Sequence, residues 1–200
     1  MSAAYKLFAI VLLTTGLAPG ATAHKGNTAA SRMPSLGAAF EFQLTAQDGT
    51  TLSLQDLRGR IVVVSFIYTR CADVCPLLTT KLVAIQKSLG GAFGRDVFFL
   101  SVTVDPEHDR PGILEDYAEA LGCDLTGWAF LTGTQAQITD VARGYGVYHE
   151  THSDGDTDHN LLTSLVDRTG RLRVQYMGER FDPDMFLKDL RRLMDIESTR

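Results

Sequence analysis

A strongly apolar run in this chain ends just before a pair of closely spaced cysteines. Residues 61–67 read IVVVSFI, a continuous β-branched stretch typical of a central strand covered on both faces. The segment that follows, ADVCPLLTTKLVAIQKSLG, has the spacing of a helix and ends at Gly90. Cys71 and Cys75 therefore close a buried strand and open a long helix. This placement constrains the fold more than any other feature of the sequence.

The remaining segments alternate between patterns typical of strands and patterns typical of helices. Residues 40–54 alternate apolar and polar positions around Asp48-Gly49, which predicts a β-hairpin. A polar stretch from Tyr148 to Asn160 contains three of the five histidines and predicts a long loop. Further strands are expected within 96–105, 128–133, 161–167 and 171–178, and helices within 111–122, 134–146 and 182–194.

This order of segments predicts one α/β domain over residues 36–200. A dithiol between the first buried strand and the first long helix is the thioredoxin arrangement. We therefore expect a thioredoxin-like fold with an N-terminal β-hairpin and a long histidine-containing loop before the C-terminal β-hairpin and helix. With 200 residues, 44% of them hydrophobic, the chain is long enough to bury one such core.

Residues 1–23 have the order of a secretory signal peptide. Lys6 precedes an apolar run over 7–17, and Ala21–Ala23 offers small residues for cleavage. The run is shorter than the roughly 20 residues that span a bilayer, so a cleaved signal is favoured over an anchor. Residues 24–35 are small and polar and predict a flexible linker. We expect an exported protein, periplasmic if the source is bacterial.

The charge balance limits the classes of partner. The formal net charge is −5, and lysine and arginine are not concentrated in any stretch. This argues against nucleic acid, DNA included, and against anionic membrane surfaces as partners. Contact with a membrane is expected only through a partner protein.

The dithiol itself has three readings: a structural disulfide, a redox couple that cycles, or two arms of a metal site. Asp73 is a candidate N-cap and Pro76 suits the first turn of the helix. A helix N-terminus favours the thiolate, and two sulfurs at this separation can bond to each other or converge on one ion. Cys123 has no cysteine near it in sequence and is expected to be a small, partly buried residue after a helix.

A metal site needs a donor beyond the two thiolates, which prefer Cu(I), with zinc as the usual competitor. His159 directly precedes an apolar strand that would fix its backbone, whereas His149 and His152 lie farther out and are expected to be mobile surface residues. The alternative is that the whole loop is a solvated acidic segment. The candidate donors are His24, His108, His149, His152 and His159.

Proline placement bears on the choice between metal binding and disulfide exchange. A thioredoxin-type oxidoreductase has a cis-proline facing its dithiol, yet no proline lies between Tyr148 and Leu165. His159 occupies that region instead, which favours a metal site. If cleavage follows Ala23, the α-amine and imidazole of His24 could also chelate Cu(II), although a terminus of this kind is usually disordered.

Four stretches resemble the Sco/SenC family of thioredoxin-fold copper proteins. They are TRCADVCP (69–76), SVTVDPEHD (101–109), FLTGTQAQITDVARGYGVY (130–148), and Asp158-His159 followed by LLTSLVDRTG (161–170). The resemblance implies that Cys71, Cys75 and His159 are copper ligands and that the two cysteines can also form a disulfide. It also implies that Asp158 supports the ligand histidine. Ala72, Asn160 and Ser164 depart from the residues most frequent in the family.

The function implied by the resemblance is that of an exported copper-binding protein. Such a protein delivers copper, as Cu(I) or Cu(II), to the dinuclear copper centre of cytochrome c oxidase, or prepares the thiols of that centre. The expected partners are the copper-bearing oxidase subunit or another copper chaperone, together with a thiol reductant.

The alternative is a thiol–disulfide oxidoreductase that acts on copper-site cysteines, or a redox sensor. A metal-free reductase would not need His159, so that residue discriminates between the two. A peroxiredoxin would require a Pro-x-x-x-Thr-x-x-Cys box, whereas Thr69 lies only two residues before Cys71 and no proline precedes it nearby.

We predict that the exported protein begins at His24, because the apolar run and the small residues that follow it specify cleavage after Ala23. N-terminal sequencing of protein recovered from the cell envelope checks this. Recovery of a chain that retains Met1 or Ser2 would show instead that the run serves as an anchor.

Overall fold

The computed structural model describes residues 33–151, 157–159 and 162–197 of the chain. The expected signal peptide, 1–23, lies outside these residues, as do His24, His152 and most of the expected linker. The linker prediction and the processing prediction therefore stay predictions. Among the described residues, no helix combines the length and the apolar character required to cross a membrane.

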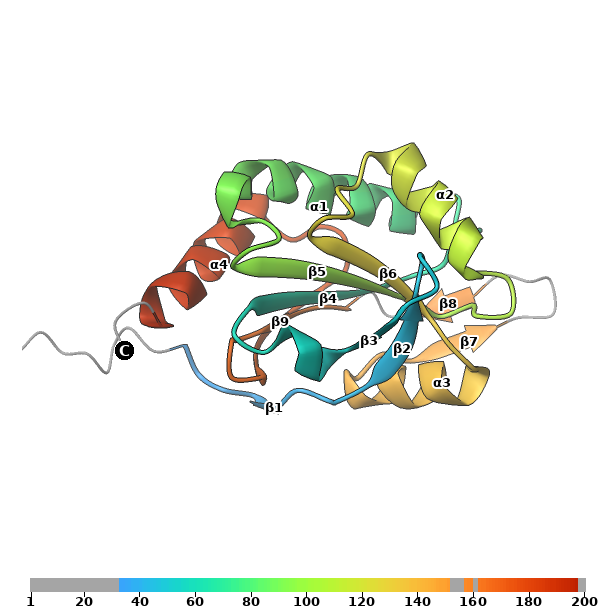
Figure 1. Cartoon of the computed structure of the whole chain (residues 1–200), viewed down its shortest axis with the longest axis horizontal. Helices are drawn as coiled ribbons and strands as arrows, with labels where there is room; N and C mark the ends of the chain where they lie inside the picture. Colours follow the sequence, from blue (N-terminus) through green and yellow to red (C-terminus); the bar gives the residue numbers. More distant parts are fainter. Residues whose placement is uncertain (1–32, 152–156, 160–161, 198–200) are drawn as a thin grey trace, which may run out of the picture. The chain divides into compact units, whose positions relative to one another are not determined.

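An eight-stranded mixed sheet with helices packed against it forms the described domain (Figure 1). Its strand order is β1-β10-β9-β4-β5-β6-β2-β3, and a separate pair, β7-β8, stands at one end. The strands are β1 (Gly37–Ala38), β2 (Gln43–Ala46), β3 (Thr51–Ser53), β4 (Ile61–Ile67), β5 (Val97–Thr103), β6 (Trp128–Thr132), β7 (His149–Thr151), β8 (Thr157–His159), β9 (Leu162–Val166) and β10 (Arg171–Met177). The helices are α1 (Val74–Leu89), α2 (Pro111–Leu121), α3 (Gln135–Gly144) and α4 (Pro183–Glu197), with short 3-10 turns η2 (Leu54–Leu57) and η3 (Gly90–Ala92).

The prediction that the continuous apolar runs are central strands, covered on both faces, is confirmed. Strand β4 is buried at every position and lies between β5, which is parallel to it, and β9, which is antiparallel. Helices α1 and α2 cover one face and α3 lies on the other (Figure 1). Because the middle strands are covered on both faces, their sequences show continuous apolar runs rather than alternation.

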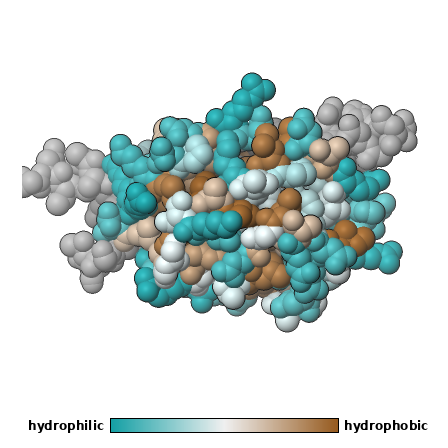
Figure 2. Space-filling view, turned by 90° about the horizontal axis from the view of Figure 1, so that it is seen from above, coloured by the Kyte–Doolittle hydropathy of each residue, from teal (hydrophilic) through white to brown (hydrophobic). Residues whose placement is uncertain are grey.

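The surface of the helical layer is mixed in character. Figure 2 looks onto the face that carries α1 and α2 and shows apolar residues interspersed with polar ones. Buried positions of α1, such as Leu78, Leu82 and Ile85, recur at helical spacing, which leaves the outer positions to solvent.

Both predicted β-hairpins are present, but the segment from Tyr148 to Asn160, which was predicted to be a loop, contains two short strands. Strands β2 and β3 pair around Asp48-Gly49, and β9 and β10 pair across the turn that contains Gly170. The polar stretch predicted to be a long loop instead contains β7 and β8, which pair with each other in antiparallel register. The sequence did not reveal them because each strand has only three residues and none of the six is strongly apolar.

The connection that leads to the dithiol is fixed by a buried carboxyl group from another segment. Asp109, fully buried between β5 and α2, accepts hydrogen bonds from the backbone N–H of Thr69 (3.1 Å), from the Thr69 hydroxyl and from the Thr103 hydroxyl. The next residue, Arg70, donates two hydrogen bonds to Asp105, at 3.0 and 2.7 Å. The two residues that precede Cys71 are therefore both held by the segment after β5.

We predict that Asp109→Asn lowers the free energy of unfolding of the reduced protein by about 1–3 kcal/mol, because an amide cannot accept all three hydrogen bonds and leaves a buried donor unsatisfied. Urea denaturation followed by circular dichroism measures the change. The matched control is Asp116→Asn on the exposed face of α2, which is expected to change stability by less than about 0.5 kcal/mol. Equal effects from the two substitutions would contradict the structural role of Asp109.

Candidate metal centre

The two thiols lie where β4 ends and α1 begins. Cys75 is fully buried in the first turn of α1, and Cys71 is 7% exposed just before the helix. The backbone N–H of Cys75 donates a hydrogen bond to Cys71 Sγ at 3.4 Å, so that sulfur lies against the amino end of the helix. All three cysteines are within the described residues and are thiols in this structure.

The helix start differs from the sequence expectation in one detail. Asp73 occupies the N-cap position, but among the described residues its side chain makes no capping hydrogen bond. The backbone N–H groups of the first turn are therefore not all taken up by a side-chain cap. Those of Asp73 and Cys75 are directed at the Cys71 sulfur instead.

The two thiols differ in acidity. Burial acts to raise the pKa of Cys71, but hydrogen bonds from the N–H groups of Asp73 and Cys75, from the Cys75 thiol and from Tyr68 outweigh it and lower that pKa. The pKa of Cys75 is raised, chiefly by burial and further by the charges of Cys71 and Asp109. Cys71 is therefore the thiol that ionises first, and Cys75 holds its proton until oxidation or a metal ion removes it.

His159 is at the same end of the sheet as the dithiol. It closes β8 shortly before Leu162, the first residue of β9. Because β9 runs antiparallel to β4, with Ser164 opposite Val64, the start of β9 lies at the end of β4 from which the dithiol follows. Figure 1 shows β7 and β8 at this end of the sheet. Asp158 precedes His159 in β8 and pairs with Glu150 of β7.

The loop predicted around His149 is a strand in the structure, and the expected surface position of His149 stays a prediction. His149 is the first residue of β7, and its register partner across the strand pair is His159. The sequence could not show this because register between two short strands depends on where the chain turns, and the turn falls within a uniformly polar stretch. His108, the other candidate donor among the described residues, is exposed in the connection after β5.

Cys123 has the environment expected from the sequence. It follows α2, is partly buried and packs against the hydrophobic core. Burial raises the pKa of Cys123 to about 12, which keeps it protonated at neutral pH.

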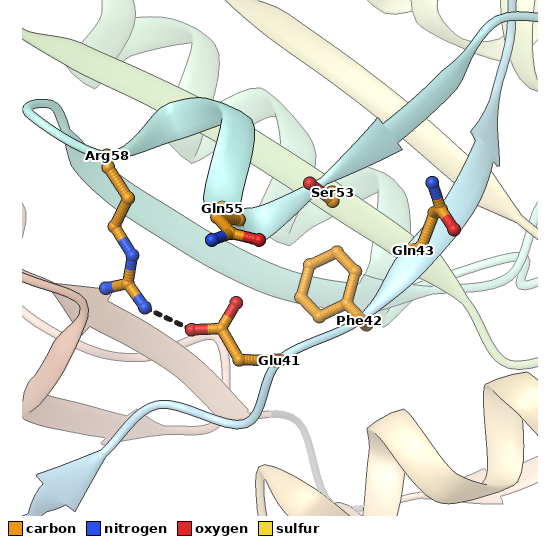
Figure 3. A pocket seen from close by; sticks show the side chains of 6 residues that line it. All are labelled: Glu41, Phe42, Gln43, Ser53, Gln55 and Arg58. Carbon is orange, nitrogen blue, oxygen red and sulfur yellow. Dashed lines mark hydrogen bonds and ion pairs between the residues drawn. The ribbon is translucent and has the colours of Figure 1, made fainter.

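Among the residues whose side chains the structure describes, which do not include His159, no group of three or more His, Cys, Asp or Glu side chains is arranged to hold a metal ion. A polar pocket of about 460 Å³ lies elsewhere, beside β2 and β3, and is crossed by the Glu41–Arg58 ion pair (Figure 3). None of its lining residues belongs to the dithiol segment or to β7 and β8: they are Glu41, Phe42, Gln43, Ser53, Gln55 and Arg58.

Comparison with known proteins gives a consistent result. The SCO1/SenC family model matches residues 31–195. The SCO1 protein homolog of Bacillus subtilis is 31% identical over 156 residues, which cover 76% of this chain and 79% of that protein. For the next three curated relatives, the chain spans between 49% and 65% of the relative's length.

Solved structures agree with the family match. The structure of Bradyrhizobium japonicum ScoI with copper bound is 31% identical, with a TM-score of 0.68 over 78% of this chain and 99% of that one. The structure of BsSco, a member of the Sco family of cytochrome c oxidase assembly proteins in which a disulfide switch was identified, is 28% identical. Its TM-score is 0.73 over 83% of this chain and 99% of that one. These neighbours confirm the thioredoxin-like fold.

We predict that mild oxidation of the metal-free protein joins Cys71 to Cys75 and leaves the Cys123 thiol unchanged, since the two sulfurs are adjacent and Cys123 is protonated. Thiol counting under denaturing conditions should then give one reactive group per chain, against three in the reduced protein. A count of three after oxidation would show that the pair does not close, and a count below one would implicate Cys123.

Proposed function

This chain belongs to the SCO1/SenC family, and on that premise we propose that it binds copper through Cys71, Cys75 and His159 and serves the assembly of the dinuclear copper centre of cytochrome c oxidase. The observation that carries the proposal is the placement of a buried dithiol at the amino end of α1, at the same end of the sheet as His159.

The donor set fits copper. Thiolate sulfur is a soft ligand that suits Cu(I), and imidazole nitrogen suits Cu(II). The Cys71 sulfur already accepts backbone hydrogen bonds, which stabilise it as a thiolate. A bound cation would offset the repulsion between two thiolates in a buried site, and it would replace the proton that Cys75 otherwise holds.

Copper binding and disulfide formation compete for the same two sulfurs. Ligation needs both thiolates, whereas the disulfide leaves neither available. A protein of this kind therefore needs a thiol reductant before it can take up copper. The copper-bearing oxidase subunit, or another copper chaperone, is the partner that we propose for the loaded form.

The alternative function is reduction of the thiols of the oxidase copper site, and one observation favours it. Cys71 has the lowered pKa and is the more exposed thiol of the pair, as the attacking residue of a dithiol reductase must be. Cys75, buried and protonated, would then resolve the mixed disulfide. Export, with a periplasmic location if the source is bacterial, belongs to both versions of the proposal and rests on the sequence of residues 1–23.

We predict that His159→Ala weakens Cu(II) binding by more than about 100-fold, because Cu(II) needs nitrogen or oxygen donors beside the sulfurs. Cu(I) binding should persist in weakened form, since two-coordinate thiolate geometry suits Cu(I), and the Cys71–Cys75 disulfide should still form. Anaerobic titration of the reduced protein with each ion, followed by visible absorption and electron paramagnetic resonance, makes the comparison.

The matched control for this experiment is His108→Ala, an exposed histidine in the connection after β5, which should bind both ions as the unsubstituted protein does. An unchanged Cu(II) spectrum in His159→Ala would overturn the ligand assignment. If that variant also supports normal oxidase assembly in cells, thiol reduction becomes the better account of the function.

A further inference from the structure

Tyr68 is the first residue after β4, and the chain is held on both sides of it. The carbonyl oxygen of Ile67 accepts a hydrogen bond from the Val104 N–H at 2.8 Å, which continues the contact between β4 and the end of β5. The carbonyl oxygen of Tyr68 accepts one from the Cys71 N–H at 3.3 Å and so closes a turn over residues 68–71. Tyr68 is also only 6% exposed. Its position is therefore set by the packed sheet and by the turn that leads to the dithiol.

Two different groups of Tyr68 reach the two sulfurs of the dithiol. The phenol hydroxyl donates a hydrogen bond to Cys71 Sγ, and the backbone N–H donates one to Cys75 Sγ. Tyr68 thus contacts both thiols from the β4 side, whereas the N–H groups of Asp73 and Cys75 reach Cys71 Sγ from the opening of α1. Removing the hydroxyl alone would leave the backbone contact with Cys75 in place.

The hydrogen bond from the hydroxyl depends on the redox state of the sulfur that accepts it. In the reduced protein, Cys71 Sγ lies against the first N–H groups of α1, which favour negative charge on that sulfur. A hydrogen bond to a charged acceptor is about twice as strong as one between neutral groups. In the disulfide, the same sulfur is bonded to Cys75 Sγ, carries no charge and is a weak acceptor. The hydroxyl therefore stabilises the dithiol more than the disulfide.

We propose that Tyr68 is a positioning residue whose hydroxyl raises the reduction potential of the Cys71–Cys75 disulfide. The inference rests on the proposed function, in which these two cysteines pass between a disulfide and the dithiol that takes up copper. A higher potential means that a given reductant holds a larger share of the chains as the dithiol. Tyr68 therefore favours the form that binds copper, although it is not itself a ligand.

Thiol–disulfide exchange with glutathione measures this effect. One molecule of glutathione disulfide takes two electrons from the two cysteines, so that the Cys71–Cys75 bond forms and the glutathione S–S bond breaks. The two thiol hydrogens of the protein pass to the two glutathione thiols that are released, and the phenol keeps its own proton. The share of oxidised protein in defined glutathione mixtures gives the equilibrium constant and, from it, the reduction potential.

The test compares Tyr68→Phe in the full chain with the matched control Tyr145→Phe. Both substitutions delete one phenol oxygen from a buried residue, but the Tyr145 hydroxyl donates to the Phe40 carbonyl oxygen, at 3.3 Å, and not to a sulfur. We expect Tyr68→Phe to shift the exchange equilibrium toward the protein disulfide by about tenfold, which corresponds to a potential lower by about 30 mV. Tyr145→Phe should shift the equilibrium by less than about twofold.

A second measurement separates this role from a general contribution to stability. Urea denaturation of the reduced and of the oxidised form of each variant gives the effect of the substitution on each redox state. Tyr68→Phe should destabilise the reduced form more than the oxidised form, because the hydroxyl loses its strong acceptor in the disulfide. Equal destabilisation of the two forms, with an unchanged potential, would show that the hydroxyl is only structural and would overturn the inference.

The same data distinguish failure of this inference from failure of the proposed function. If the Cys71–Cys75 disulfide forms in the unsubstituted protein and has the same potential in Tyr68→Phe, the inference is wrong and the proposed function stands. If glutathione disulfide produces no Cys71–Cys75 disulfide in the unsubstituted protein, the exchange between disulfide and dithiol is absent, and both are overturned.

Discussion

The hydrogen bonds from Thr69 to Asp109 are the interaction on which the geometry of the site depends. Without a fixed approach to Cys71, the sulfur could not stay against the first N–H groups of α1, because the chain between β4 and the helix is irregular. Asp109 supplies that fixed approach from the segment after β5, a neighbouring strand. The position of the dithiol is thus fixed by the sheet, by the connection from β4 to α1 and by the connection from β5 to α2, and not by α1 alone.

The unequal acidity of the two thiols arises from the same geometry. Cys71 lies at the opening of the helix, where backbone N–H groups reach its sulfur, and Cys75 lies one turn further, where burial dominates. One thiolate and one thiol side by side are suited to reacting with an oxidant and to binding a metal ion, because both events remove the same proton. This explains why the dithiol alone does not decide between copper delivery and thiol reduction, and why the proposed function is tested at His159.

Much of the fold could be predicted from the sequence, because the central strands are covered on both faces and appear as continuous apolar runs. The position of the cysteine pair at the start of a helix could also be predicted, since the pair lies between such a run and a helical pattern in the sequence. The role of Asp109 was not, because its partners, Thr69 and Thr103, come from two other segments and meet it only in the folded sheet. The pairing of His149 with His159 was missed for a similar reason: strand register within a polar stretch leaves no apolar pattern to read.

The position of β9 next to β4 has a consequence for how the chain matures. β9 is made long after β4 and α1, yet it is the neighbour that completes one side of β4. A growing or truncated chain that stops before Leu162 presents β4 as an unprotected edge of seven consecutive buried-type residues, and such an edge invites pairing with other chains. Correct folding of this protein therefore depends on the last fifth of its sequence, from Leu162 onward, reaching the middle of the sheet.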